Sequence, residues 1–150
     1  MVEMIDTKYW RYFINNEFTD IERKYVGKWM YFFDFKDRNR YVTLVKDAVA
    51  SGSVRMAKLS FNESSPRNPK QGVICFYVDG RDIVAQQRCL QFMLTHDLIS
   101  HKQNGDLYNI SFKFDNQTLA GQYGSDFKAS LKLADIMDLH TETFRKDYEK

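Results

Sequence analysis

The segment Gly27-Lys28-Trp29-Met30-Tyr31-Phe32-Phe33 has the composition of an aromatic β-strand that carries one lysine near its start. Two later segments are also typical of strands and each keeps a lysine or a tyrosine, Arg55-Met56-Ala57-Lys58-Leu59-Ser60 and Val73-Ile74-Cys75-Phe76-Tyr77-Val78. Aromatic residues alone are typical of a strand that serves only the core. Basic and hydroxyl-bearing residues that recur inside such strands instead indicate a sheet face that meets a polar group, such as an anionic ligand.

Length and composition predict a single globular domain over residues 1–150. Hydrophobic residues make up 43% of the chain and aromatic residues 15%, which suits a packed core and argues against disorder. The 22 basic and 20 acidic residues nearly balance. Because a chain with so little net charge lacks the main affinity term for a polyanion, extended nucleic acid is not an expected partner.

The amino-terminal residues and the cysteines predict a cytoplasmic protein without membrane contact. The chain does not start with a basic region and an apolar core, and no apolar run approaches the ~20 residues of a membrane helix. Cys75 and Cys89 fall in a predicted strand and a predicted helix, and neither has a second cysteine at metal-binding spacing. We expect both thiols to be reduced and packed, and we expect no cofactor and no metal.

Hydrophobic periodicity predicts an α+β domain. Helices are expected over residues 4–16, 38–51 and 79–96, and Gly52 is placed to end the second of them. Strands are expected over residues 28–35, 54–60, 73–78, 108–114, 118–123 and 130–133. This order matches neither a regular β–α–β alternation nor an all-β pattern. It predicts a curved, mainly antiparallel sheet with helices packed on one face.

Particular side chains support the first and last helices and the end of the chain. Residues 4–16 place four large side chains on one helical stripe, namely Ile5, Tyr9, Tyr12 and Phe13. Asp79 is expected to cap the last helix by accepting a hydrogen bond from the backbone N–H of Asp82. The mostly charged tail, residues 140–150, is expected to form a short helix or to fray.

Several short segments between residues 27 and 123 together carry a family resemblance. They are Gly27-Lys28-Trp29, Gly52, Ala57-Lys58-Leu59-Ser60, Val73-Ile74-Cys75-Phe76-Tyr77, Arg88, Lys113, Asp115, Thr118, Leu119, Gly121 and Tyr123. In this order they resemble the basophilic leukaemia-expressed protein family. The resemblance implies the fold of the cap-binding translation initiation factor and raises the expectation of ligand binding. That factor holds a methylated base between two tryptophans, an arrangement not expected here because Trp29 lies within a strand.

The same resemblance implies an enzymatic alternative, because some members of that family carry a phosphothreonine-lyase label. Such a reaction needs a lysine as base and a histidine as acid, and Lys58 matches the first role. His96, His101 and His140 lie outside the matched segments, so no acid is carried over. Because no pair of histidines has metal-ligand spacing, their expected roles are on the surface or at helix ends.

Basic and aromatic side chains of the strands form the predicted ligand site. The proposed contacts are Lys28, Trp29, Arg55, Lys58, Tyr77, Lys113 and Tyr123. Cations that converge on one sheet face hold phosphate or carboxylate through charge-assisted hydrogen bonds. The opposing interpretation is that these cations are solvated on the open face of a one-sided sheet, while the aromatic rings pack the core.

The leading hypothesis is a non-enzymatic binding protein. Its ligand is expected to be small and anionic, foremost a nucleotide or a phosphorylated group, on the concave sheet face. The first alternative is a phosphothreonine-lyase-like enzyme with Lys58 as base. The second is a protein-binding module or inhibitor that contacts its partner through Trp10 or the exposed sheet.

Overall fold

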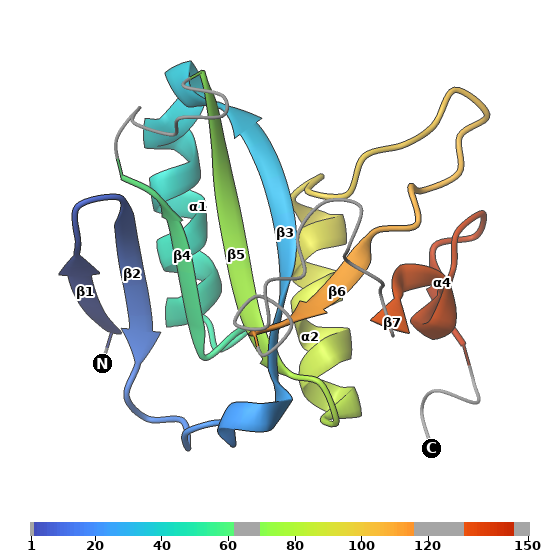
Figure 1. The fold of residues 1–150 in the computed structure, drawn as a ribbon. Helices are drawn as coiled ribbons and strands as arrows, with labels where there is room; N and C mark the ends of the chain where they lie inside the picture. The colour runs from blue at the N-terminus through green and yellow to red at the C-terminus, as the bar shows by residue number, and fades with distance from the viewer. Residues whose placement is uncertain (1, 62–69, 116–130, 146–150) are drawn as a thin grey trace. The chain divides into compact units, whose positions relative to one another are not determined.

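The fold, taken from a computed structural model, is described for residues 2–61, 70–115 and 131–145 (Figure 1). It is α+β, and its main feature is a large, mostly antiparallel sheet that does not close on itself. The strand order is β1-β2-β4-β5-β3-β6-β7. The predicted fold class is therefore confirmed.

The main sheet and its helices have the following bounds. The strands are β1 (Val2–Asp6), β2 (Trp10–Asn15), β3 (Val26–Asp34), β4 (Met56–Ser60), β5 (Gln71–Asp79), β6 (Ser111–Phe114) and β7 (Leu131–Lys132). The helices are α1 (Arg38–Ala50), α2 (Ile83–Thr95) and α4 (Leu133–Ile136), with 3-10 turns η1 (Arg23–Tyr25) and η2 (Phe35–Asp37). A separate two-stranded sheet pairs β8 (Met137–Asp138) with β9 (Thr143–Phe144). None of the helices described is long and apolar enough to cross a membrane.

The chain divides into two compact units. The first comprises Met1–Asp20 and Met30–Tyr77, and the second comprises Ile21–Trp29 and Val78–Lys150. The first unit contains β1, β2, β4 and α1, together with most of β3 and β5. The second contains α2, α4, β6, β7 and the small β8–β9 sheet.

The first unit begins with a β-hairpin, so the prediction of a helix over residues 4–16 is wrong. β1 and β2 pair antiparallel with Met4 opposite Phe13, and Thr7 closes the turn by accepting a hydrogen bond from the Trp10 N–H at 3.1 Å. Phe13 and Asn15 are buried on alternate positions of β2. Aromatic and β-branched residues pack well on a half-buried strand. This preference explains why the segment forms strands, although its apolar residues also match helical spacing.

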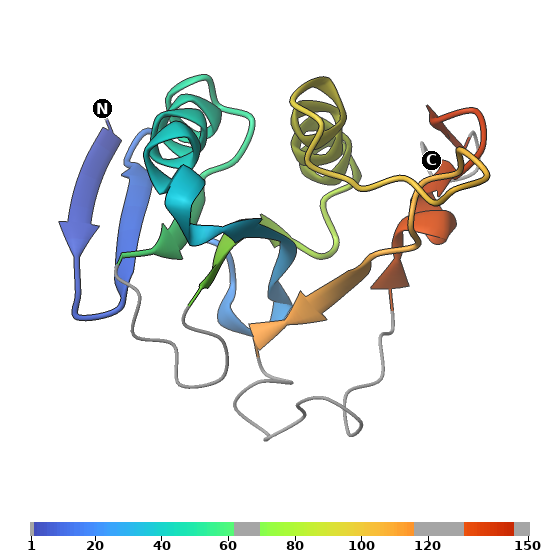
Figure 2. The same ribbon diagram turned by 90° about the horizontal axis from the view of Figure 1, so that it is seen from above.

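Helix α1 packs against β2 and β4 in the first unit (Figure 2). It buries Tyr41, Val45, Ala48 and Val49, which form one face of the helix. Gly52 follows the helix with a φ of 80°, a left-handed conformation that costs glycine little and stops the helix where predicted.

Strands β3 and β4 of the first unit alternate between a buried and a more open face. On β4, Ala57 and Leu59 are fully buried, whereas Lys58, which lies between them, is on the opposite face. On β3, Phe33 is buried and packs across Gly72 of β5, where an added Cβ would lie 2.4 Å from the ring. The backbone N–H of Phe35 donates to the Lys70 carbonyl at 2.8 Å, as expected for antiparallel neighbours.

The N-cap of helix α2 in the second unit lies three residues after the predicted one. Asp82 is its N-cap and accepts a hydrogen bond from the Ala85 N–H at 3.0 Å. Asp79, the predicted cap, is still part of β5 and accepts from the Arg81 N–H at 2.8 Å, so the prediction for Asp79 is wrong. The helix buries Cys89, and Cys75 is buried on β5. Both cysteines are free, as predicted.

The carboxyl-terminal part of the second unit differs from its prediction at both ends. β6 starts at Ser111 rather than at Tyr108, which is exposed. The expected strand near residues 130–133 is confirmed as β7. A short helix or a frayed tail was expected over residues 140–150, but Thr143–Phe144 form strand β9, which pairs with β8, and residues 146–150 lie outside the described residues. The predicted strand over residues 118–123 lies outside the described residues.

Candidate functional site

The predicted ligand-binding residues divide between the two units. Arg55, Lys58 and Tyr77 belong to the first unit, and Lys28, Trp29 and Lys113 belong to the second. Tyr123 lies outside the described residues.

Lys58 is surrounded by aromatic rings from the two neighbouring strands of the first unit. Its Nζ lies 3.9 Å from the centre of the Trp10 ring, 5.7 Å from that of Tyr12 and 5.9 Å from that of Tyr77. Such distances allow the negative ring faces to attract the ammonium group. The structure therefore holds a cation among three rings on the sheet.

Strand register brings these four side chains together. Tyr12 of β2 is directly opposite Lys58 of β4. Tyr77 of β5 is opposite Met56, one diagonal step from Lys58, which is within reach of a long side chain. Because Lys58 alternates with buried Ala57 and Leu59, the cluster lies on the face of β4 turned away from α1.

The four side chains of the cluster differ in their exposure to solvent. Lys58, Trp10 and Tyr12 are all half-buried, so each offers part of its surface to a ligand. Tyr77 is only 5% exposed, so its ring contributes a buried neighbour of the Lys58 ammonium. We define the Lys58 face as Trp10, Tyr12, Lys58 and Tyr77. Trp10 was not among the predicted ligand contacts, because its place beside β4 depends on the hairpin that the sequence analysis missed.

Arg55 has a different role from Lys58. Its guanidinium forms an ion pair with Asp20, which ties the segment after β2 to the start of β4. Within the described chain, the buried Arg55 Nε has no hydrogen-bond partner. The pairing with Asp20 supports a structural role.

A second group of cations lies on the face of the β2–β4 pair to which buried Leu59 belongs. Arg11, opposite Leu59 in the register, pairs with Asp6 at 2.7 Å, and this hydrogen bond lowers the pKa of Asp6. The guanidinium groups of Arg11 and Arg38 lie 5.2 and 5.3 Å from the Phe61 ring centre. Burial, followed by the repulsion of Arg11, lowers the pKa of Arg38. This group is distinct from the Lys58 face because Arg11 points to the other side of β2.

Lys28 and Lys113 are opposite each other in the second unit, across the β3–β6 pair. Lys28 is only 9% exposed, and its Nζ donates to Asp115 Oδ1 at 2.9 Å. Like charges directly opposite on a sheet repel, and a buried cation needs a counter-charge. Asp115 supplies that counter-charge, which gives the lysine pair a structural explanation.

Trp29 belongs to the core. It is 0% exposed, its Nε1–H donates to Gln86 Oε1 at 2.6 Å, and its ring centre lies 5.2 Å from that of Phe112. A ring enclosed in this way has no free face on which a ligand can stack. We therefore remove Trp29 from the proposed ligand contacts.

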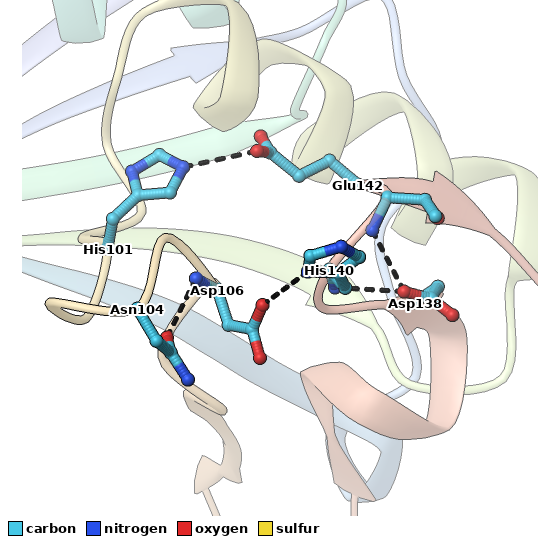
Figure 3. Close-up of polar contacts among 7 residues, drawn as sticks. His101, Asn104, Asp106, Asp138, His140 and Glu142 are labelled. Atoms are coloured by element: carbon cyan, nitrogen blue, oxygen red, sulfur yellow. Dashed lines mark hydrogen bonds and ion pairs between the residues drawn. The ribbon is translucent and has the colours of Figure 1, made fainter.

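Two histidines of the second unit each contact a carboxylate (Figure 3). His101 Nε2 lies 3.2 Å from Glu142 Oε2, and His140 Nδ1 lies 2.7 Å from Asp106 Oδ1. The hydrogen bond and the charge of Asp106 raise the pKa of His140. All four side chains are substantially exposed, which suits the surface roles that the sequence predicted.

His96 and Asp138 have local structural roles at a helix end and in a turn. His96 is the C-cap of α2, and its ring lies 4.2 Å from that of Phe92. Asp138 accepts hydrogen bonds from the N–H groups of Thr141 and His140, which lower its pKa. Across the described ranges, no three His, Cys, Asp or Glu side chains gather as a metal ion would require.

No protein-family model matches the chain, and a comparison with curated proteins also finds no match. The resemblance to the basophilic leukaemia-expressed protein family therefore stays a prediction.

Proposed function

We propose that the protein binds a small anionic ligand, foremost a nucleotide or another phosphorylated group, on the Lys58 face. The observation that carries the proposal is the Lys58 ammonium held 3.9 Å from the Trp10 ring on a half-buried sheet face. This arrangement combines a positive charge with aromatic surface at one place.

The chemistry of the cluster suits an anion that also carries a ring. An ammonium group over a ring keeps its positive charge, which attracts phosphate oxygens and favours charge-assisted hydrogen bonds with them. Partial burial strengthens such a bond, because the local dielectric is lower than that of water. The exposed parts of Trp10 and Tyr12 offer apolar contact to the rest of the ligand.

Two further predictions belong to this proposal. The expected fold remains that of the cap-binding initiation factor, and an α+β chain with a large antiparallel sheet is compatible with it. A cytoplasmic location is supported by Cys75 and Cys89, which are buried and free, as is usual in a reducing compartment.

The lyase alternative receives less support from the Lys58 face. That reaction needs an acid as well as a base, and His96, His101 and His140 lie outside the segments that carry the family resemblance. The protein-binding alternative has one observation in its favour. Phe32 alternates with buried Phe33 on β3 and is 54% exposed, which leaves a large apolar side chain on the open face.

Calorimetric titration with inorganic phosphate, phosphothreonine and adenosine 5′-monophosphate tests the proposal. Lys58→Met keeps the apolar stem and removes the charge, whereas Lys46→Met removes an exposed lysine of α1 in the same unit. Loss of a hydrogen bond to a charged group, at ~1.5–3 kcal/mol, should weaken the best probe about 10- to 150-fold in Lys58→Met only.

Two results would overturn the proposal. One is equal affinity in Lys58→Met and the unaltered protein, with thermal unfolding showing that both are folded. The other is failure of all three probes to bind the unaltered protein at millimolar concentration. Conversion of phosphothreonine to its dehydrated product, lost in Lys58→Met, would favour the lyase instead.

A further inference from the structure

We propose that two histidine–carboxylate pairs of the second unit form a proton-dependent clasp that closes the 101–107 loop onto the β8–β9 hairpin. The loop supplies His101 and Asp106, and the hairpin supplies His140 and Glu142 (Figure 3). Each segment thus gives one histidine and one carboxylate, so both contacts gain charge when the histidines are protonated.

The clasp lies beside a backbone contact between the same two segments. The N–H of Leu107 donates to the Leu139 carbonyl at 2.9 Å, and the Leu107 side chain is fully buried. The loop is closed by a bridge between His101 and Leu107, with Gly105 at a φ of 92° in its turn. Opening the clasp should therefore expose the Leu107 amide before the rest of the unit unfolds.

One residue in the turn of the β8–β9 hairpin has an unfavourable backbone conformation, which an additional contact can help to stabilise. Glu142 has a φ of 60°, a left-handed value that is uncommon for a residue with a side chain. Its N–H donates to the Asp138 carbonyl at 2.9 Å, and its carboxylate meets His101. The contact with His101 therefore helps to offset the cost of this turn.

The charged groups around His140 favour its protonation. Asp106 is bonded to His140, and Asp138 also attracts its charge. Glu142 faces His101. Arg145 is the cation that acts on Asp138, and Lys102 is next to His101 in the chain. Among the described residues, these three carboxylates therefore outnumber the two cations, Arg145 and Lys102.

The pKa of His140 is raised above 6.5 by Asp106, so protonation of His140 is coupled to closure. A raised histidine pKa gives stability that is fully present below the unfolded-state value and is lost as pH rises through the folded-state value. Closure should therefore weaken as pH rises through the folded-state pKa of His140.

Amide hydrogen exchange of Leu107, corrected for the intrinsic pH dependence of exchange, tests the clasp. Protection should fall by about 1.5- to 5-fold between about pH 5.5 and 8.5 as His140 loses its proton, the range expected for an exposed ion pair. In His101→Gln/His140→Gln this fall should disappear. His96→Gln, at the end of α2, is the matched control and should keep it. The Leu90 amide within α2 should show no such fall in any variant.

The titration of His140 by NMR provides a second and independent readout. Its midpoint should lie above 6.5 in the unaltered protein and return toward that value in Asp106→Asn. Leu107 protection that is independent of pH would overturn the proposal, as would an unchanged pH dependence in the double histidine variant. A His140 midpoint that Asp106→Asn does not move would overturn it as well.

Discussion

Replacing Trp29 by Phe should destabilise the protein through one buried hydrogen bond. Trp29 and Gln86 are both 0% exposed, and the Trp29 Nε1–H donates to Gln86 Oε1 at 2.6 Å. Phe has no such donor, so the Gln86 carbonyl oxygen is left buried without its partner, at a cost of about 1–3 kcal/mol. The smaller ring adds a cavity of roughly 40 Å³, or about 1 kcal/mol at ~24 cal/mol per Å³. The free energy of unfolding should fall by about 2–4 kcal/mol in total.

A double-mutant cycle separates the hydrogen bond from the packing. Gln86→Leu removes the acceptor and also the Gln86 Nε2, which has no hydrogen-bond partner in the part of the chain described. In Trp29→Phe/Gln86→Leu both polar groups are gone, and replacing both partners by apolar groups is often nearly neutral. The double variant should therefore be more stable than the sum of the single changes by about 1–2 kcal/mol.

Urea unfolding, monitored by circular dichroism, gives the free energy of unfolding of each variant of the cycle. A common dependence of this free energy on urea concentration checks that unfolding is two-state. Trp10→Phe is the matched control, because Trp10 is half-buried and should cost only about 0.5–1 kcal/mol through its contact with Lys58. A Trp29→Phe cost below about 0.5 kcal/mol, or additivity within that margin, would refute the assignment of Trp29 to the core.

Three further predictions concern stability and reactivity. Gly72→Ala should cost about 1–3 kcal/mol by urea unfolding, because its Cβ would lie 2.4 Å from the Phe33 ring; an unchanged stability would show that the ring can move aside. Asp82→Ala should cost about 0.5–2 kcal/mol through loss of the α2 cap, whereas Asp82→Asn should cost less, and equal losses would argue against capping. Burial raises the pKa of Cys89, so its alkylation by iodoacetamide should follow global unfolding; rapid alkylation of the native protein would contradict this burial.

The elements that local pattern determines could be predicted from the sequence. The stripe of α1 and the glycine after it are local signals, and both the helix and its end at Gly52 were found. The aromatic strands β3 and β5 were also found, because their length and composition suffice. The β1–β2 hairpin was missed because its deciding contact, Met4 opposite Phe13, lies across a turn and leaves the apolar positions compatible with a helix.

The candidate site depended more on tertiary contacts. Lys58 was identified from its strand, but its partner Trp10 becomes visible only when the hairpin sets β2 beside β4. The burial of Trp29 depends on Gln86, 57 positions away in the chain, which periodicity cannot show. The β8–β9 hairpin has two residues in each strand, too few to give an alternating pattern.

An NMR titration of the isotope-labelled protein with adenosine 5′-monophosphate tests the central claim most directly, because it locates the bound anion. We predict the largest shifts at the Trp10 indole N–H and at the backbone amides of Tyr12 and Lys58, and we predict that Lys58→Met strongly reduces them at the same ligand concentration. Shifts of the same size in Lys58→Met, or shifts confined to the second unit, would contradict the claim that the Lys58 face binds the ligand.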